Sequence, residues 1–264
     1  MYPVLLRFQG NEIHTYGVML ALGFILGVHV ATRQAEQLGL DVVQVTNVLL
    51  ACLATSIVGA RTTYVLVNWH HFGAHPIEIL QLQRGGLVYY GGLIGGTLAG
   101  VLGALYYRIP VGVFADIVPA GLCTGQILGR IGCLTNGCCY GAPTALPWAI
   151  RLAYGPGALV ARHPTPIYEA LLCATIMTVS IRFFLRPHRP GMLMVGYLYA
   201  YGAGRFAIEL LRGDERGGDY LLGLSVSQCI SVGTLLVAVV WHALARRQPI
   251  ADPGQPPPEP AALE

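Results

Sequence analysis

The sequence IHTYGVMLALGFILGVHVATR, residues 13–33, decides the class of fold. It contains no Asp, Glu, Lys or Arg before Arg33. An α-helix needs about 20 consecutive apolar residues to cross the hydrocarbon core of a bilayer, so this stretch predicts a transmembrane helix. Similar stretches recur along the chain and predict seven spans, at residues 13–33, 45–67, 87–107, 112–132, 167–185, 191–211 and 224–245.

The composition of the whole chain favours the same class. Of its 264 residues, 54% are hydrophobic and only 11% are charged, and the mean hydropathy is +0.57. Soluble domains usually carry about 25% charged residues. We therefore predict an all-α polytopic membrane protein. The formal net charge of +3 is too small to indicate a nucleic-acid partner.

The placement of the basic residues, all sixteen of which are arginine, predicts the topology. With the N-terminus outside, the inner segments hold seven arginines and the outer segments hold six. Because the inner loops are short, the positive-inside rule favours an outside N-terminus and a cytoplasmic C-terminus. We predict one transmembrane domain at 1–247, with a small extracytoplasmic lid at 133–166. A disordered, proline-rich cytoplasmic tail follows at 248–264.

Three arginines, Arg61, Arg130 and Arg205, fall inside or at the edge of predicted spans. A mid-membrane arginine costs about 2.5 kcal/mol or more, so each should have a partner or a function. Glu209 lies one helical turn after Arg205 and can pair with it, whereas Arg61 and Arg130 have no acid three or four residues away. An unpaired guanidinium beside an apolar chamber suits a phospholipid phosphate, because arginine presents a planar fork and keeps its charge.

Two glycine-rich motifs accompany these arginines. The first, GRIGCLTNGCCYG (129–141), surrounds Arg130, and its glycines permit a ligand to approach the backbone closely. They are equally typical of helix packing. The second, RGGLVYYGGLIGG (84–96), opens the third span with Tyr89 and Tyr90. These two side chains point about 100° apart on a helix, so one can join an interfacial aromatic belt while the other faces inward.

A further motif, HPTPIYEA (163–170), places His163 in the predicted lid and Glu169 at the start of the fifth span. A glutamate in the first turn of a helix complements the helix dipole. A supporting role in a phospholipid site is the other interpretation, and the sequence leaves both open. We include His163 and Glu169 among the candidate residues of such a site.

The seven cysteines separate into two groups. Four lie singly in apolar stretches and are predicted to be small core residues: Cys52, Cys123, Cys173 and Cys229. The others, Cys133, Cys138 and Cys139, have the ligand type of a zinc site, with His163 nearby in sequence. However, the C-x4-C-C spacing differs from the usual C-x2-C, and adjacent cysteines rarely both bind one metal. We therefore predict no metal and favour a disulfide or simple packing.

Four motifs together resemble those of one family, the prolipoprotein diacylglyceryl transferases. They are RGGLVYYGGLIGG, GRIGCLTNGCCYG, RHPTPIYEA and YAYGAGRFAIELLR, and IHTYGVMLALGFILG resembles the family's first span. The resemblance covers about residues 10–245. It implies an enzyme of the bacterial plasma (inner) membrane whose catalytic domain is the predicted domain 1–247. The enzyme would move the diacylglyceryl group of phosphatidylglycerol onto the lipobox cysteine thiol of preprolipoproteins, the first step of lipoprotein lipidation. We expect membrane lipids as surroundings, no cofactor, and a monomer.

The resemblance also assigns residues by position. Arg130 matches the motif arginine assigned to phosphatidylglycerol binding, and Arg205 matches the essential arginine of the sixth span. The predicted catalytic residues are Arg205, Tyr90, Glu209 and Tyr16. The predicted phospholipid-binding residues are Arg130, Arg61, Asn136, Gly132, Gly141, Glu169 and His163.

Two departures from the family pattern bear on the mechanism. Many members have a histidine, proposed as the base, where this chain has Tyr90, and some have asparagine and glutamate in place of Cys133 and Cys138. Tyrosine has a reference pKa near 10, so a histidine-base mechanism does not carry over. We predict electrostatic catalysis, in which Arg130 and Arg205 stabilise the charge that develops on the leaving phosphate. Tyr90 would hydrogen-bond the acceptor thiol or pass its proton on.

Two other functions fit parts of the pattern. Glycine-rich spans and intramembrane arginines also occur in transporters, so a non-enzymatic phospholipid-binding protein or flippase is one alternative. Against it, the sequence has no inverted repeat and no proton-relay chain. The other alternative is a paralogue that uses the same chamber on a different acceptor.

Overall fold

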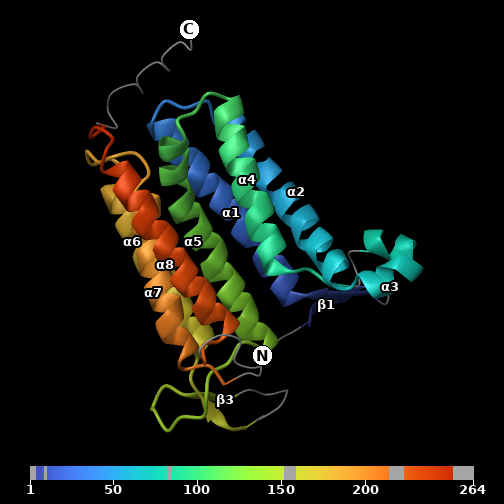
Figure 1. Cartoon of the computed structure of the whole chain (residues 1–264). Coiled ribbons are helices and arrows are strands. Elements are labelled where there is room, and N and C mark those ends of the chain that lie inside the picture. Colours follow the sequence, from blue (N-terminus) through green and yellow to red (C-terminus); the bar gives the residue numbers. More distant parts are fainter. Residues whose placement is uncertain (1–3, 9–10, 82–84, 152–158, 214–222, 252–264) are drawn as a thin grey trace. The chain divides into compact units, whose positions relative to one another are not determined.

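A computed structural model describes residues 4–8, 11–81, 85–151, 159–213 and 223–251. The long helices of this part of the chain are α1 (Thr15–Gln37), α2 (Val42–Val67), α4 (Tyr89–Tyr106), α5 (Val111–Asn136), α6 (Thr165–Phe184), α7 (Met192–Glu209) and α8 (Val226–Ala245). The shorter elements are helix α3 (Trp69–Ala74), the 3-10 turn η1 (Pro76–Leu80), and strands β1 (Val4–Phe8), β2 (Asn11–His14), β3 (Ile150–Arg151) and β4 (Ala161–Arg162). Each predicted span falls in one long helix, and the predicted all-α class is confirmed (Figure 1).

Five of the helices, α1, α2, α5, α6 and α8, are long and apolar enough to cross a membrane by length and composition. The third and sixth predicted spans form α4 and α7, each 18 residues long. Helix α5 ends at Asn136 rather than at the predicted residue 132, so residues 133–136 of the predicted lid are helical. Of the predicted tail, residues 252–264 lie outside the described residues. Ala251 pairs with His188 through two backbone hydrogen bonds.

The described residues form two compact units. The first comprises the residues up to Gln34 and those from Ala115 onward, and the second comprises Ala35–Phe114. In the second unit, α2 and α4 run side by side (Figure 1). Their backbones touch at glycines, because a Cβ atom on Gly91 would overlap the carbonyl oxygen of Gly59.

In the first unit, a glycine contact joins α1 to α5. A Cβ atom on Gly27 would lie 2.7 Å from the carbonyl oxygen of Gly121, and one turn away Gly23 meets Gly125. Glycines four residues apart on both helices let membrane helices approach closely. Helices α6, α7 and α8 pack in sequence order beside them, and their core includes the fully buried Cys173. The four predicted core cysteines are buried or half-buried.

A buried carboxylate, Asp116 of α5, caps the start of α7. Its oxygens accept hydrogen bonds from the backbone N–H groups of Gly191 (2.6 Å), Leu193 (2.8 Å) and Met194 (3.3 Å). Gly191 has φ = 89°, the left-handed region that favours glycine. The first N–H groups of a helix have no partner within the helix, and an anion there also complements the helix dipole. The polar Asp116 therefore occurs in an apolar span because it caps the N-terminus of another helix.

The ring of His188 is the other partner of this carboxylate. Its Nε2 atom lies 3.2 Å from Oδ2 of Asp116, and its Nδ1 atom lies 2.6 Å from the carbonyl oxygen of Arg186. Because both ring nitrogens face acceptors, the doubly protonated imidazolium is favoured. The hydrogen bond to Asp116 raises the pKa of His188 above 6.5, against the opposing effect of its burial.

We expect Asp116→Ala to destabilise the protein by roughly 3 kcal/mol, because it leaves several buried backbone N–H groups of α7 without an acceptor. Thermal unfolding of the detergent-solubilised protein measures the loss. Asp41→Ala is the matched control, since Asp41 caps α2 at an exposed position and its removal should cost only about 1 kcal/mol. Equal losses in the two variants would contradict the assignment.

We also expect stability to fall as the pH is raised above about 6.5. A histidine with a raised pKa in the folded state contributes stability that is fully present below its unfolded pKa and is lost as the pH passes its folded pKa. The melting temperature, measured at roughly every half pH unit between pH 6 and pH 8.5, should fall as the pH rises. His188→Gln should reduce this dependence of the melting temperature on pH, whereas a control change at the exposed His70 should leave the dependence unchanged.

Candidate functional site

A buried carboxylate of α6, Glu169, is the centre of the candidate site. Only 1% of its surface is exposed. Its Oε1 atom accepts hydrogen bonds from Nη2 of Arg130 on α5 (2.5 Å) and from the hydroxyl of Tyr201 on α7 (2.9 Å). Its Oε2 atom lies 3.9 Å from Nε of Arg205 on α7. One carboxylate thus connects both arginines that the sequence assigns to the lipid phosphate.

The second arginine has its own acid on the same helix. Nη1 of Arg205 lies 2.6 Å from Oε2 of Glu209, which confirms the predicted pairing of these residues one turn apart. Nη2 of Arg205 donates a hydrogen bond to the hydroxyl of Ser227 (3.1 Å), and the hydroxyl of Ser225 bonds Oε1 of Glu209 (3.1 Å). The start of α8 therefore completes the shell around this pair.

The four ionised side chains of this network, Arg130, Arg205, Glu169 and Glu209, sum to zero charge. Glu169, Arg205 and Glu209 are at least nine-tenths buried or close to it, and an unpaired charge at such positions would be expensive. The neutral sum explains how two arginines are retained inside a bundle of apolar helices. It also corrects one premise of the sequence interpretation, because Arg130 has an acidic partner, supplied by another helix.

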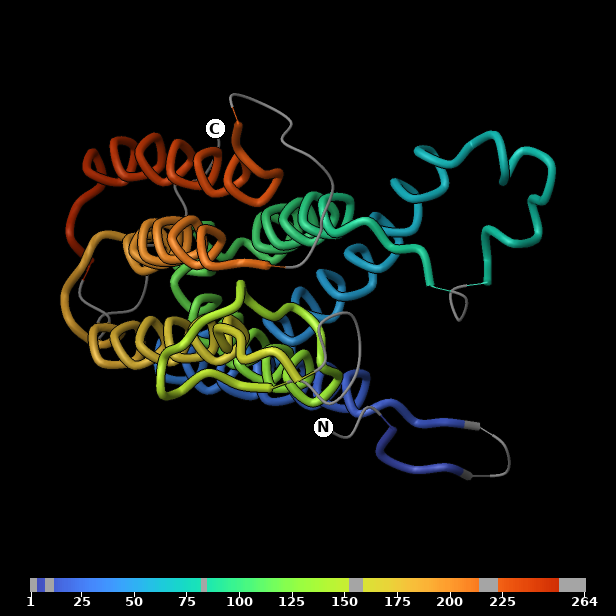
Figure 2. Tube along the Cα trace, turned by 90° about the horizontal axis from the view of Figure 1, so that it is seen from below, coloured from blue at the N-terminus to red at the C-terminus, as the bar shows by residue number. Residues whose placement is uncertain are grey.

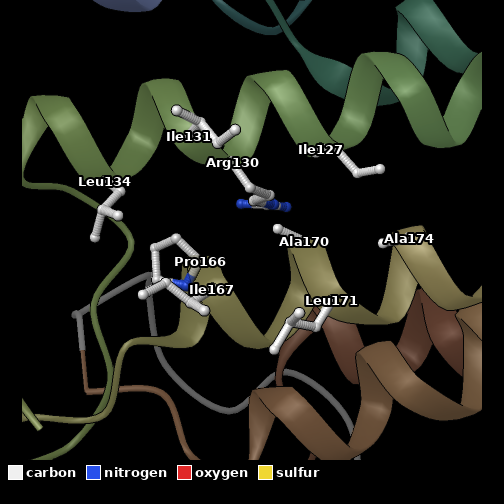
Figure 3. A pocket seen from close by; sticks show the side chains of 9 residues that line it. All are labelled: Ile127, Arg130, Ile131, Leu134, Pro166, Ile167, Ala170, Leu171 and Ala174. Atoms are coloured by element: carbon white, nitrogen blue, oxygen red, sulfur yellow. The ribbon is translucent and has the colours of Figure 1, made fainter. Parts of the chain in front are cut away.

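Arg130 differs from Arg205 in its access to the surface. Its side chain is 21% exposed and points from α5 toward α6, into an apolar groove of about 220 Å³ (Figure 3). The apolar residues around it are Ile127, Ile131, Leu134, Pro166, Ile167, Ala170, Leu171 and Ala174. Among the residues that the structure describes, the Arg130 guanidinium makes one hydrogen bond, that to Glu169.

Tyr16, in the first turn of α1, lies against the same end of α5. A Cβ atom on Gly132 would be 3.1 Å from Cδ2 of Tyr16, so the absence of a side chain at Gly132 makes room for the ring. Gly132 follows Arg130 by two residues. The structure therefore places the predicted first-span tyrosine beside the motif that contains the predicted lipid arginine.

The described parts of the chain between α5 and α6, residues 137–151 and 159–164, lie at this end of the first unit (Figures 1 and 2). They include the short antiparallel pair β3–β4, and Gly141 packs closely there. A Cβ atom on Gly141 would be 2.5 Å from Cβ of His163, and its N–H donates to the carbonyl oxygen of His163 (2.9 Å). The His163 ring contacts the hydroxyl of Tyr168 (3.2 Å). These two predicted residues thus shape the segment, and Asn136 lies exposed at its start.

The remaining predicted residues, Arg61 and Tyr90, belong to the second unit. Arg61 is 7% exposed and binds backbone carbonyls of the segment between α3 and α4, including Ile79 (2.9 Å) and Gly85 (2.7 Å). These bonds account for its burial without a phosphate. Tyr90 is the second residue of α4, and its ring meets that of Tyr89, the first, edge to face. Tyr89 is 67% exposed and Tyr90 is 37% exposed, so both rings are exposed, and the expectation that one of them faces inward stays a prediction.

Several residues of the site were not predicted. Tyr201 lies one turn before Arg205 on the face of α7 that also carries Glu209, and this spacing is a signal that the sequence offered. Ser225 and Gln228 form a capping box at the start of α8, whose S-x-x-Q pattern is also readable from sequence. Nothing in the sequence indicated that Glu169 would meet Arg130, because the two are 39 residues apart.

Comparison with known proteins decides the family. A family model described as prolipoprotein diacylglyceryl transferase matches residues 3–244. The chain belongs to this family. This confirms the resemblance seen in the four motifs.

Individual members of the transferase family align with nearly the whole chain. A relative from Clostridioides difficile strain 630 is 34% identical over 234 residues, which is 88% of this chain and 91% of the relative. One from Clostridium tetani is 32% identical over 241 residues (90% and 96%), and one from Geobacter sulfurreducens is 33% identical over 253 residues (94% and 96%). All three are named phosphatidylglycerol–prolipoprotein diacylglyceryl transferase.

The network predicts the effect of neutralising its central acid. Glu169→Gln should destabilise the protein by roughly 3 kcal/mol, because it leaves two largely buried arginines with one anion between them. Glu12→Gln is the control, since Glu12 pairs with Arg7 at an exposed site and should cost no more than about 1 kcal/mol. Thermal unfolding in one detergent measures both. If Glu169→Gln and the wild type have the same melting temperature, the ionic network does not stabilise the packing of α5, α6 and α7.

Proposed function

We propose that the protein transfers the diacylglyceryl group of phosphatidylglycerol to the thiol of the lipobox cysteine of preprolipoproteins, the first step of bacterial lipoprotein lipidation. One observation carries the proposal: a member of this transferase family has an arginine, held by a buried glutamate, that opens on an apolar groove between two helices. A phospholipid needs both parts, a cation for its phosphate and an apolar surface for its acyl chains.

The phosphate of the lipid binds at Arg130. The guanidinium N–H groups that do not bond Glu169 have the planar, permanently charged geometry that suits phosphate oxygens. The acyl chains lie along the apolar side chains of α5 and α6 that line the groove. Asn136, Gly132 and Gly141 help to shape this end of the site, and His163 and Tyr168 support the segment above it.

The buried network responds to the charge of the bound lipid. A phosphodiester at Arg130 competes with Glu169 for the guanidinium. Glu169 then shifts its bonding toward Arg205, whose Nε atom already lies 3.9 Å from Oε2. The network is neutral before binding, so Arg130 can gain a phosphate without leaving a buried carboxylate unpaired. Arg205 in this way supports the charge at Arg130 through Glu169, and Glu209 fixes the Arg205 guanidinium.

In the reaction, the sulfur of the acceptor forms a bond to the terminal glyceryl carbon, and the bond from that carbon to the phosphate oxygen breaks. The electron pair stays on the oxygen, glycerol phosphate leaves, and the thiol proton passes to solvent or to the leaving phosphate. Arginine charge stabilises the developing phosphate dianion. Tyr16, beside Gly132, is the hydroxyl group that we assign to the acceptor side of the chamber. Tyr90, in the second unit, stays a predicted catalytic residue.

The membrane, the topology and the partners of the protein follow from the same proposal. The protein lies in the bacterial inner membrane with its N-terminus outside and its C-terminus in the cytoplasm, and it acts as a monomer. The domain 1–247 is catalytic, the lid region is the predicted 133–166 on the extracytoplasmic side, and the tail begins at 248. Phosphatidylglycerol and preprolipoprotein signal peptides are the partners.

Purified protein mixed with phosphatidylglycerol and a lipobox peptide tests the function by peptide mass. The wild type should add one diacylglyceryl group to the cysteine. Arg205→Ala should lower the rate about 100-fold or more, and Arg130→Lys about 10-fold, because the lysine keeps the charge and loses the fork.

Arg182→Lys, on an exposed position of α6, is the control and should retain full activity. A wild type that binds phosphatidylglycerol without changing the peptide mass would instead identify a lipid-binding protein or flippase. A wild type active only on a different thiol or hydroxyl acceptor would identify a paralogue with another substrate. Full activity of Arg205→Ala would remove that arginine from the mechanism.

A further inference from the structure

Three thiols that the transfer reaction does not require come together at the end of α5. The Sγ atoms of Cys133, Cys138 and Cys139 all lie within 4.8 Å of one another. Cys133 is buried in the last turn of α5, and the other two are half-buried in the segment that follows. The C-x4-C-C spacing alone did not predict this convergence.

The turn that ends α5 brings the sulfurs together. Gly137 has φ = 71°, and the N–H of Cys138 donates back to the carbonyl oxygen of Cys133 (3.1 Å). Cys139 also has a positive φ of 64°, which is uncommon for a residue with a side chain. The hydroxyl of Thr165, at the start of α6, bonds the carbonyl oxygen of Cys139 (2.6 Å) and holds it in this conformation. Strained backbone that is held by a neighbouring element is typical of functional sites.

A cation lies beside this cluster. The Arg212 guanidinium is within hydrogen-bonding reach of the sulfur of Cys139. Arg130 lies three residues before Cys133, so these side chains occupy one face of α5. Arg212 is therefore the cation next to the cluster, since Arg130 is already paired with Glu169.

Neither interpretation that the sequence favoured uses all three sulfurs. A disulfide would join two and leave the third, and packing alone does not explain a strained cysteine beside an arginine. A metal ion uses all three at once. Zinc–sulfur bonds are about 2.3 Å long, which places tetrahedral ligands about 3.8 Å apart, so the sulfurs need to move by only about 1 Å or less.

We propose that Cys133, Cys138 and Cys139 bind a Zn²⁺ ion through three thiolates, and that the thiolate of the acceptor cysteine is its fourth ligand. The charge fits, because Zn²⁺ with three thiolates carries −1, and Arg212 is the cation beside it. Three protein ligands with one open position are the pattern of catalytic zinc sites.

The consequence for the reaction, which rests on the proposed function, concerns how the acceptor thiol loses its proton. Cys133, Cys138 and Cys139 would hold the ion, and the ion would supply a Lewis acid that favours the thiolate of the acceptor, whose proton passes to solvent, so no histidine base is needed. The acceptor sulfur forms its C–S bond to the glyceryl carbon as the C–O bond to phosphate breaks, and the electron pair leaves with the phosphate oxygen.

Metal analysis of the purified protein is the first test. The wild type, incubated with Zn²⁺ and washed, should retain about one ion per chain. Cys133→Ser, Cys138→Ser and Cys139→Ser should each retain far less. Cys229→Ser, a cysteine of α8 outside the cluster, should match the wild type. Helix content by circular dichroism verifies that the variants are folded. No bound zinc in the wild type, or an intact mass two hydrogens lower from a disulfide, would overturn the proposal.

The fourth ligand is tested without turnover. Co²⁺ in place of Zn²⁺ gives visible bands that depend on its ligands, and these should shift when a lipobox peptide is added and not when its Cys→Ser form is added. Unchanged bands would overturn the acceptor assignment. If the wild type stripped of metal still forms the thioether at full rate, zinc has no part in the reaction, while the proposed transferase function stands. A protein that passes both metal tests but never forms thioether would refute the transferase function alone.

Discussion

The bonds of one buried carboxylate, Glu169, hold the functional part of this molecule together. Its two oxygens face arginines from α5 and α7, and a tyrosine hydroxyl from α7 completes its shell. Each arginine alone would be too costly at a position of low dielectric, and the carboxylate alone would be too. The three helices therefore need one another for electrostatic reasons as well as for packing. Helix α8 adds hydroxyls to the same network.

The neutral network explains how a membrane protein can keep a cation ready for an anionic lipid. Arg130 faces an apolar groove and donates one of its N–H groups to Glu169. In the proposed function, the lipid phosphate exchanges with Glu169, which has a second arginine available. Binding on this proposal redistributes charge within the protein and does not create an unpaired ion. This property separates a phospholipid site from a merely structural ion pair such as that of Arg7 and Glu12 at the surface.

Local patterns predicted much of this and failed where distant residues meet. The apolar stretches predicted every long helix, and the spacing of Arg205 and Glu209 predicted their ion pair. The partner of Arg130 could not be predicted, since Glu169 lies on another helix and its position fitted a dipole role equally well. The sequence did not indicate the capping role of Asp116, because the N–H groups that it caps belong to α7. The same holds for the sulfurs of the C-x4-C-C motif, which converge only because of a turn with positive φ angles.

Asp116 and Arg130 together also restrain the movement of α5. They lie 14 residues apart on α5, about 21 Å along its axis, and each is tied to neighbouring helices by charged hydrogen bonds. A helix that is bonded to its neighbours at two distant points resists sliding and rotation against them. We therefore expect α5, α6 and α7 to stay in register throughout a catalytic cycle. On the proposed function, we expect a bulky lipid to enter the groove through side-chain movements along α5 and α6, without the large helix displacements of rocking transporters.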